Sequence, residues 1–118
     1  MSDFKKLGVW EKAHELALGV DRAAAAIRPA RYASLRNQMV RAAMSIPTNI
    51  VEGCGQESRK EFARFLRYGV NSASELEYHL IVARDIRVID SVKYGLLTNQ
   101  TIEVRRMLIG LIRRVSSS

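Results

Sequence analysis

The sequence predicts an all-α protein, a single antiparallel up-down-up-down four-helix bundle that spans residues 1–118. Apolar residues recur every three or four positions through four successive segments, which is the period of an amphipathic helix. Only two prolines and seven glycines interrupt the 118 residues, so long segments are left for helices. Short stretches separate the four segments, and helices joined by short connections lie side by side and antiparallel. The length suits one domain with one core.

The first predicted helix covers residues 9–28 and ends ahead of Pro29, because the residue before a proline is disfavoured in the helical conformation. Its apolar stripe, at steps of four and three, consists of Val9, Ala13, Leu16, Val20, Ala23 and Ile27. The second predicted helix covers residues 32–53 and runs into a glycine stop at Gly53 and Gly55. Its inward-facing residues are Leu35, Met39, Ala42, Ile46 and Ile50.

Pro47 lies inside the second predicted helix, where it removes one backbone hydrogen bond and crowds the carbonyl group four residues earlier. Either the helix is kinked there, with the Ser45 hydroxyl bonded to a freed carbonyl, or it breaks and Pro47 begins a new turn. The apolar periodicity continues through Pro47 without a change of phase, which favours the kink. A kink is expected to aim the side chains of Asn49 and Glu52 inward.

The third predicted helix covers residues 58–86 and opens with a capping box, in which the Ser58 hydroxyl and the Glu61 carboxylate accept from each other's backbone amides. Its apolar stripe is Phe62, Phe65, Gly69, Ala73, Leu76, Leu80 and Ala83. The fourth covers residues 91–115, with a stripe of Leu97, Val104, Leu108, Leu111 and Val115. Three isoleucines lie off this stripe and form a candidate surface for self-association: Ile102, Ile109 and Ile112.

The net charge of +7 comes from fourteen arginines and five lysines against twelve acids. Arginine forms forked hydrogen bonds to phosphate, so this excess favours a nucleic-acid partner; a solvated basic face is the alternative. Lys60, Arg64 and Arg67, spaced by four and three, are expected to form one exposed stripe, and Arg106 and Arg113 another. The candidate phosphate-binding residues are Arg36, Arg41, Arg59, Lys60, Arg64, Arg67, Arg106 and Arg113.

The sequence does not predict an enzyme, because it has no nucleophile–base pair, phosphate-cradling glycine loop or nucleotide fingerprint. Glu11 and His14 have the Glu-x-x-His spacing of di-iron bundles, but a second such pair is lacking, since Glu75 and His79 are four apart. No metal or cofactor is therefore expected, and both histidines are expected at the surface or its boundary. Cys54, between two glycines, is expected to be a small loop residue.

Glu52 and Glu75 are each expected near the bundle interior, either as an acid–base pair or, as we favour, as acceptors of structural hydrogen bonds. Trp10 either anchors a partner surface or, as we slightly favour, covers the end of the bundle's own core. No apolar run is long enough to span a membrane, and a single cysteine suits the reducing cytoplasm, where we expect the protein.

Three stretches of the sequence resemble the signatures of one family. They are residues 4–16 (FKKLGVWEKAHEL), residues 35–53, which end in RAAMSIPTNIVEG, and residues 58–85, which include EFARFL and SELE. The family is that of the four-helix-bundle proteins encoded in the intervening sequences of bacterial 23S ribosomal RNA. The resemblance implies an antiparallel bundle that assembles into a ring-shaped homopentamer, with no established activity for most members. The sequence is distantly similar to the accessory proteins of diversity-generating retroelements, which are basic pentamers that bind a reverse transcriptase and nucleic acid.

The sequence departs from the family pattern at Asn71, where a small glycine is usual, and at Ile86-Arg87-Val88, which replaces a Leu-Gly-Tyr turn. Charge and resemblance together lead to one expectation: a non-enzymatic, oligomeric four-helix-bundle protein that binds RNA or DNA through phosphate-directed arginines. The alternative is a protein–protein interaction scaffold with no nucleic-acid role, in which the arginines pair with acids of a partner.

Overall fold

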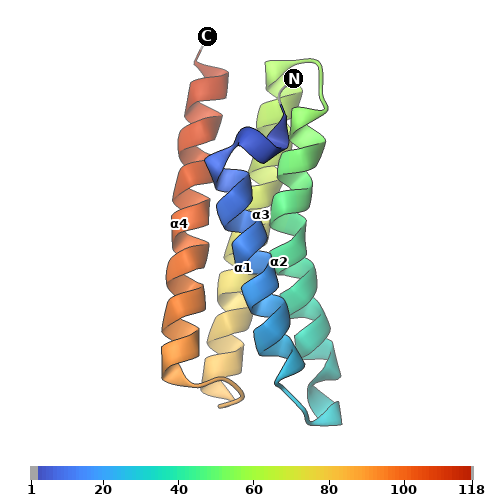
Figure 1. Ribbon diagram of the computed structural model, residues 1–118, viewed down its shortest axis with the longest axis vertical. Coiled ribbons are helices and arrows are strands. Elements are labelled where there is room, and N and C mark those ends of the chain that lie inside the picture. Colours follow the sequence, from blue (N-terminus) through green and yellow to red (C-terminus); the bar gives the residue numbers. More distant parts are fainter. Residues whose placement is uncertain (1–2, 118) are drawn as a thin grey trace.

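The protein is all-α in this computed structural model, which describes residues 3–117 (Figure 1). It consists of four long helices, α1 (Gly8–Ala25), α2 (Ala33–Cys54), α3 (Arg59–Asp85) and α4 (Ser91–Ser116), and two short 3-10 turns, η1 (Phe4–Lys6) and η2 (Ala30–Tyr32). Residues 3–117 contain no β-strand and no helix that is long and apolar enough to cross a membrane. The prediction of an all-α protein with four helices is confirmed.

The four helices lie lengthwise beside one another in a body of 48 × 21 × 20 Å. In Figure 1 the chain passes down α1, up α2, down α3 and up α4, and the last helix packs against the first. Glycine allows three of the helices to approach closely at one level. A Cβ atom on Gly69 of α3 would lie 3.3 Å from Leu108 Cδ1 of α4 and 3.9 Å from the Ile46 carbonyl oxygen of α2.

One apolar core runs along the bundle. Its largest fully buried side chains include Leu16, Met39, Ile46, Ile50, Leu66, Leu76, Leu80, Leu97 and Leu108. Burying such a side chain stabilises the fold by roughly 1.5–3 kcal/mol relative to leaving it exposed. Thr101 also lies in this core, because its hydroxyl donates to the Leu97 carbonyl at 2.7 Å and so has a partner away from water.

The connection from α1 to α2 is held by an arginine. The guanidinium of Arg36, in the first turns of α2, donates to the carbonyl oxygens of Ile27 at 2.8 Å and Pro29 at 2.9 Å. Carbonyls just beyond a helix end have no intrahelical donor, so a side chain that supplies one fixes the path of the chain. Arg36 is therefore a structural residue of this connection.

α2 continues without a break through Pro47, which is buried. The alternative in which Pro47 starts a new turn is therefore wrong, whereas the kink stays a prediction. The Ser45 hydroxyl shares a 2.8 Å hydrogen bond with the Ser72 hydroxyl of α3, not with a freed carbonyl as expected. Asn49 is half-buried and donates to the carbonyl and the hydroxyl of Ser45 at 2.8 and 3.0 Å. Glu52 is exposed and does not point inward, because a carboxylate is costly to remove from water.

α3 ends in a Schellman motif, at the segment that departs from the family pattern. The Val88 amide donates to the Ala83 carbonyl and the Arg87 amide to the Arg84 carbonyl, both at 3.0 Å. Arg87 has a φ of 63°, the left-handed conformation that glycine usually occupies at this place.

Arg84 donates a hydrogen bond to the Asp85 carboxylate, which raises the pKa of the Arg84 guanidinium.

Candidate nucleic-acid interface

Basic side chains line a groove where α3 begins and α4 ends. The groove has a volume of about 320 Å³ and is lined by Arg59, Lys60, Ala63, Arg67, Val115 and Ser116. Lys60 and Arg67 are exposed, and neither has an acid partner within residues 3–117. Because they are seven residues apart on one helix, they lie about 10 Å apart on the same face. The fold thus brings Arg59, Lys60 and Arg67 together.

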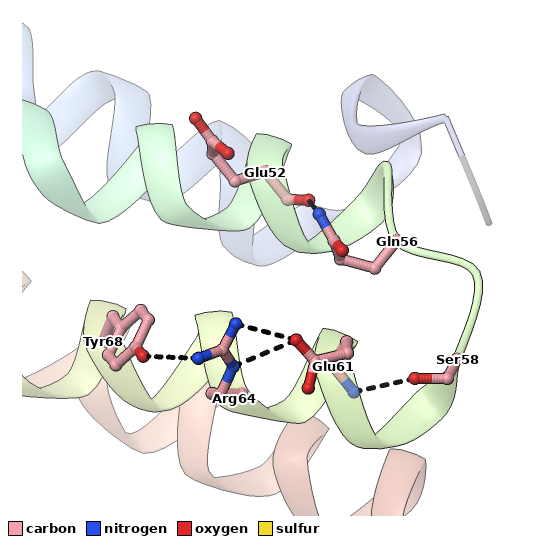
Figure 2. Close-up of polar contacts among 6 residues, drawn as sticks. All are labelled: Glu52, Gln56, Ser58, Glu61, Arg64 and Tyr68. Carbon is pink, nitrogen blue, oxygen red and sulfur yellow. Dashed lines mark hydrogen bonds and ion pairs between the residues drawn. The ribbon is translucent and has the colours of Figure 1, made fainter.

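The first turn of α3, which carries Arg59 and Lys60, is capped by Ser58. The Glu61 amide donates to the Ser58 hydroxyl at 3.1 Å, so the hydroxyl half of the predicted capping box is present. The carboxylate half differs from the prediction. The Glu61 carboxylate binds Arg64, with Nη2 at 2.8 Å and Nε at 3.1 Å, one turn further along the helix (Figure 2).

Arg64 is engaged within α3 and does not share a free stripe with Lys60 and Arg67. Its guanidinium also donates to the Tyr68 hydroxyl at 3.1 Å and lies 5.7 Å from the centre of the Tyr68 ring. Figure 2 shows the guanidinium between Glu61 and Tyr68 along one side of the helix. A phosphate would have to displace these contacts, so we leave Arg64 out of the interface.

Two candidates on α2 lie away from the groove. Arg36 is half-buried, and the carbonyls of Ile27 and Pro29 engage its guanidinium. Arg41, in the middle of α2, is exposed and has no acid partner within residues 3–117. It lines a separate polar recess between α2 and α3.

α4 carries exposed cations towards its C-terminal end. Arg106 and Arg113 have no acid partner in the part of the chain that the structure describes. Arg106 lines a mainly apolar recess of about 390 Å³ between the start of α1 and α4, and Arg114 lines it too. Arg114 is not among the phosphate-binding residues predicted from the sequence, although its position next to Arg113 could have indicated it. Arg105, in contrast, is paired with Glu77 of α3 at 2.7 Å.

Trp10 is half-buried against the core and stacks on His14, with ring centres 5.1 Å apart and an angle of 5° between the planes. Phe4 of η1 packs against the same tryptophan edge-on, also with 5.1 Å between ring centres. These contacts favour the interpretation in which Trp10 covers the core of its own bundle.

The remaining polar candidates lie differently from the prediction. Glu75 is exposed, as is Glu52, so neither lies near the interior. Glu75 Oε1 is 3.9 Å from Nε2 of His79, which is buried and does not lie at the surface as expected. Cys54 is not a loop residue but the buried last residue of α2. Within residues 3–117 no group of three or more His, Cys, Asp and Glu side chains is placed to hold a metal ion.

Comparison with known proteins covers most of the chain. Residues 5–110 match the sequence model of a family described as 23S rRNA-intervening sequence protein. The chain is also similar to the crystal structure, at 1.70 Å resolution, of a protein of unknown function from the S23 ribosomal protein family of Bacteroides thetaiotaomicron. The two sequences are 25% identical, the match covers 89% of this chain and 98% of that one, and the TM-score is 0.84. No curated protein matches the sequence.

Proposed function

The chain belongs to the 23S rRNA-intervening sequence protein family, and we propose that it is a non-enzymatic, oligomeric protein that binds RNA or DNA through phosphate-directed arginines. The observation that carries the proposal is the groove between α3 and α4, where Arg59, Lys60 and Arg67 share one hollow. Arg113 is exposed near the same end of α4. A chain with a net charge of +7 attracts a polyanion from a distance, and the groove supplies the place of contact.

The groove suits a sugar–phosphate backbone. Its charged groups are all cations, and the rest of its lining is small or aliphatic, so it has no carboxylate or amide side chain to accept hydrogen bonds from a base edge. Cations about 10 Å apart along α3 can follow a phosphate chain without reading its sequence. Each neutralised phosphate releases a counterion, so the affinity falls steeply as the salt concentration rises.

Self-association belongs to the same proposal. The unit is an antiparallel up-down-up-down bundle with α2 kinked at Pro47, and copies assemble in the cytoplasm as the ring of five that the resemblance implies. Support comes from α4, which exposes Val92 by 81%, Leu96 by 55% and Ile109 by 37%. Covering these side chains with a second copy removes apolar surface from water. Several grooves in one assembly raise a weak affinity through avidity.

Fluorescence anisotropy of a labelled single-stranded RNA of about 20 nucleotides, titrated at about 50 and 200 mM salt, tests the groove. The variant Lys60→Glu/Arg67→Glu/Arg113→Glu reverses three charges and lowers the net charge of +7 by six. The control Arg22→Glu/Arg28→Glu/Lys93→Glu makes the same change at exposed positions in the last turn of α1, in the connection from α1 to α2 and in the first turn of α4. We expect the groove variant to lose at least about tenfold more affinity than the control, with a smaller salt slope by about 1 per lost phosphate contact.

Equal losses in the two variants would mean that net charge alone drives binding, and the groove would lose its role. An absence of binding at the lower salt concentration would remove nucleic acid from the proposal altogether. Sizing the purified protein with and without nuclease treatment reports both the number of copies and any nucleic acid that copurifies.

The second candidate function is a protein–protein interaction scaffold. Besides the apolar side chains of α4, Leu18 is 44% exposed and Met44 is 49% exposed, so apolar contact surface is available on three helices. In that case Leu96→Asp and Ile109→Asp should abolish complex formation, while the charge reversals in the groove should leave it unchanged.

A further inference from the structure

A polar recess between α2 and α3 is distinct from the groove at the end of the bundle. It has a volume of about 270 Å³ and is lined by Gln38, Arg41, Ala42, Ser45, Ser72 and Glu75. The lining combines one cation, one anion, one amide and two hydroxyls. This mixture differs from the groove, whose charged groups are all positive.

One hydroxyl hydrogen in the recess has no acceptor within residues 3–117. Ser45 and Ser72 share a single hydrogen bond of 2.8 Å, in which one hydroxyl donates to the other. The Ser45 oxygen also accepts from the Asn49 side-chain amide at 3.0 Å. Two hydroxyls carry two hydrogens, so whichever one donates within the pair, the other hydrogen is left for a molecule in the recess.

The two charged side chains of the recess come from different helices and do not pair with each other. Arg41 is beyond ion-pair distance of every acid in residues 3–117, and Glu75 Oε1 lies 3.9 Å from Nε2 of His79. The Gln38 amide nitrogen donates to the Ser34 hydroxyl at 3.0 Å, which leaves the Gln38 side-chain oxygen as an acceptor. The recess therefore offers a guanidinium from α2 and a carboxylate from α3 that do not form an ion pair with each other.

We propose that this recess binds a guanine base of single-stranded RNA or DNA, an inference that rests on the proposed function. Arginine donates two hydrogen bonds to O6 and N7 of guanine, the commonest specific contact between a side chain and a base, and Arg41 supplies this fork. N1–H and the N2 amino group of guanine are neighbouring donors, which match the two oxygens of the Glu75 carboxylate. The unpaired serine hydroxyl hydrogen and the Gln38 side-chain oxygen can form hydrogen bonds with the sugar or with a ring atom of guanine.

The other bases match this lining less completely. Adenine lacks O6, so the arginine fork has one acceptor on that edge where guanine has two. Cytosine offers a carboxylate only its amino group, and uracil only one ring N–H. Guanine alone presents two atoms to each charged side chain. Such a contact requires an unpaired base, because proteins read RNA sequence mainly where bases are splayed out of a helix.

The test compares a labelled strand of nine uridines with the same strand carrying one central guanosine, by fluorescence anisotropy at about 100 mM salt. We expect the guanosine strand to bind at least about tenfold more tightly, as one bidentate base contact provides. Glu75→Gln should abolish this preference, although it makes the protein more positive and so strengthens phosphate binding. Glu15→Gln, at an exposed acid of α1, makes the same change in charge and should keep the preference.

Each negative result of this test has a different meaning. Equal binding of both strands would overturn the guanine inference and leave the proposed function intact. Binding of neither strand would overturn the proposed function, and the inference with it. A preference for guanosine that survives both Glu75→Gln and Arg41→Gln would place base recognition elsewhere. An NMR titration adds a further test. If free glycine shifts the Ser72 amide resonance and guanosine monophosphate does not, the recess is an amino-acid site and the inference is overturned. Circular dichroism checks that the variants keep their helical content.

Discussion

Gly53 of α2 lies against the ring of Phe62 of α3, so that a Cβ atom on Gly53 would come within 2.8 Å of the Phe62 Cδ1 atom. The same atom would lie 3.2 Å from the Cβ of Phe65. The two helices therefore meet at a point that has no room for a methyl group. Gly53 and Gly55 were expected to stop the second helix. α2 ends at Cys54 with Gly55 as its C-cap, so Gly53 lies inside the helix and its role is close packing.

Gly53→Ala should destabilise the protein by about 1 kcal/mol or more. Overpacking against Phe62 costs about 1–3 kcal/mol, which exceeds the gain in helix propensity of at most about 1 kcal/mol. Urea unfolding followed by circular dichroism measures the change. Gly95→Ala is the matched control, since a Cβ atom there has no neighbour within 4 Å, and it should stabilise the protein. Stabilisation by both substitutions would contradict the close contact.

Arg36→Met should destabilise the protein by about 1.5–3 kcal/mol, because two carbonyls lose hydrogen bonds from a charged donor while the aliphatic stem is kept. The free energy of unfolding in urea is again the measurement. Arg22→Met, at an exposed arginine of α1 that makes no hydrogen bond within residues 3–117, should change it by less than about 0.5 kcal/mol. A loss of RNA binding in Arg36→Met without a loss of stability would instead return Arg36 to the phosphate-binding set.

Arg87→Gly should stabilise the protein by about 0.5–1 kcal/mol. An L-residue in the left-handed conformation costs roughly 1–2 kcal/mol, and glycine relieves this strain at a smaller cost in chain entropy. Thermal unfolding should show a higher midpoint. Arg84→Gly, three residues earlier and inside α3, should have the opposite effect because glycine weakens a helix interior.

Pro47→Ala should restore a backbone hydrogen bond in α2 and straighten that helix, yet weaken the proposed assembly. We expect the dissociation of the oligomer, followed by light scattering over a dilution series, to shift to at least about tenfold higher concentration. Pro29→Ala, in the exposed connection before α2, should leave assembly unchanged. An unchanged oligomer in Pro47→Ala would show that a bend at this proline is not needed for assembly.

The helices and the centre of the core could be predicted from sequence because both depend on local periodicity. All six stripe residues of the first predicted helix are buried, for example. The stripes were not right at every position: Leu35, Phe65 and Val115 are only half-buried, whereas Leu66, outside the predicted stripe, is fully buried. Two buried polar residues were also missed. Thr101 is fully buried, which its hydrogen bond to the carbonyl four residues back allows, and His79 is buried on α3. Periodicity alone assigns neither to the core.

The candidate interface was less predictable, because sequence spacing does not show which cations are already paired. Arg105 and Arg106 are neighbours in the sequence, yet within residues 3–117 only Arg105 has an acid partner, Glu77, which is 28 residues away. Arg64 has the right spacing for a stripe with Lys60 but bonds Glu61 and Tyr68 on its own helix. Tertiary contacts, such as that of Arg105, and contacts within one helix, such as those of Arg64, therefore decide which arginines are available to bind phosphate.

α3 carries both proposed contact points on one unbroken rod. Arg67 in the groove and Glu75 in the recess are eight residues apart, which fixes their separation along the axis at about 12 Å. The helix therefore acts as a ruler. A nucleic-acid strand that binds at both points must be long enough to span them, and the spacing between its bound phosphate and its bound base is fixed. A shorter oligonucleotide can occupy the groove or the recess, but not both.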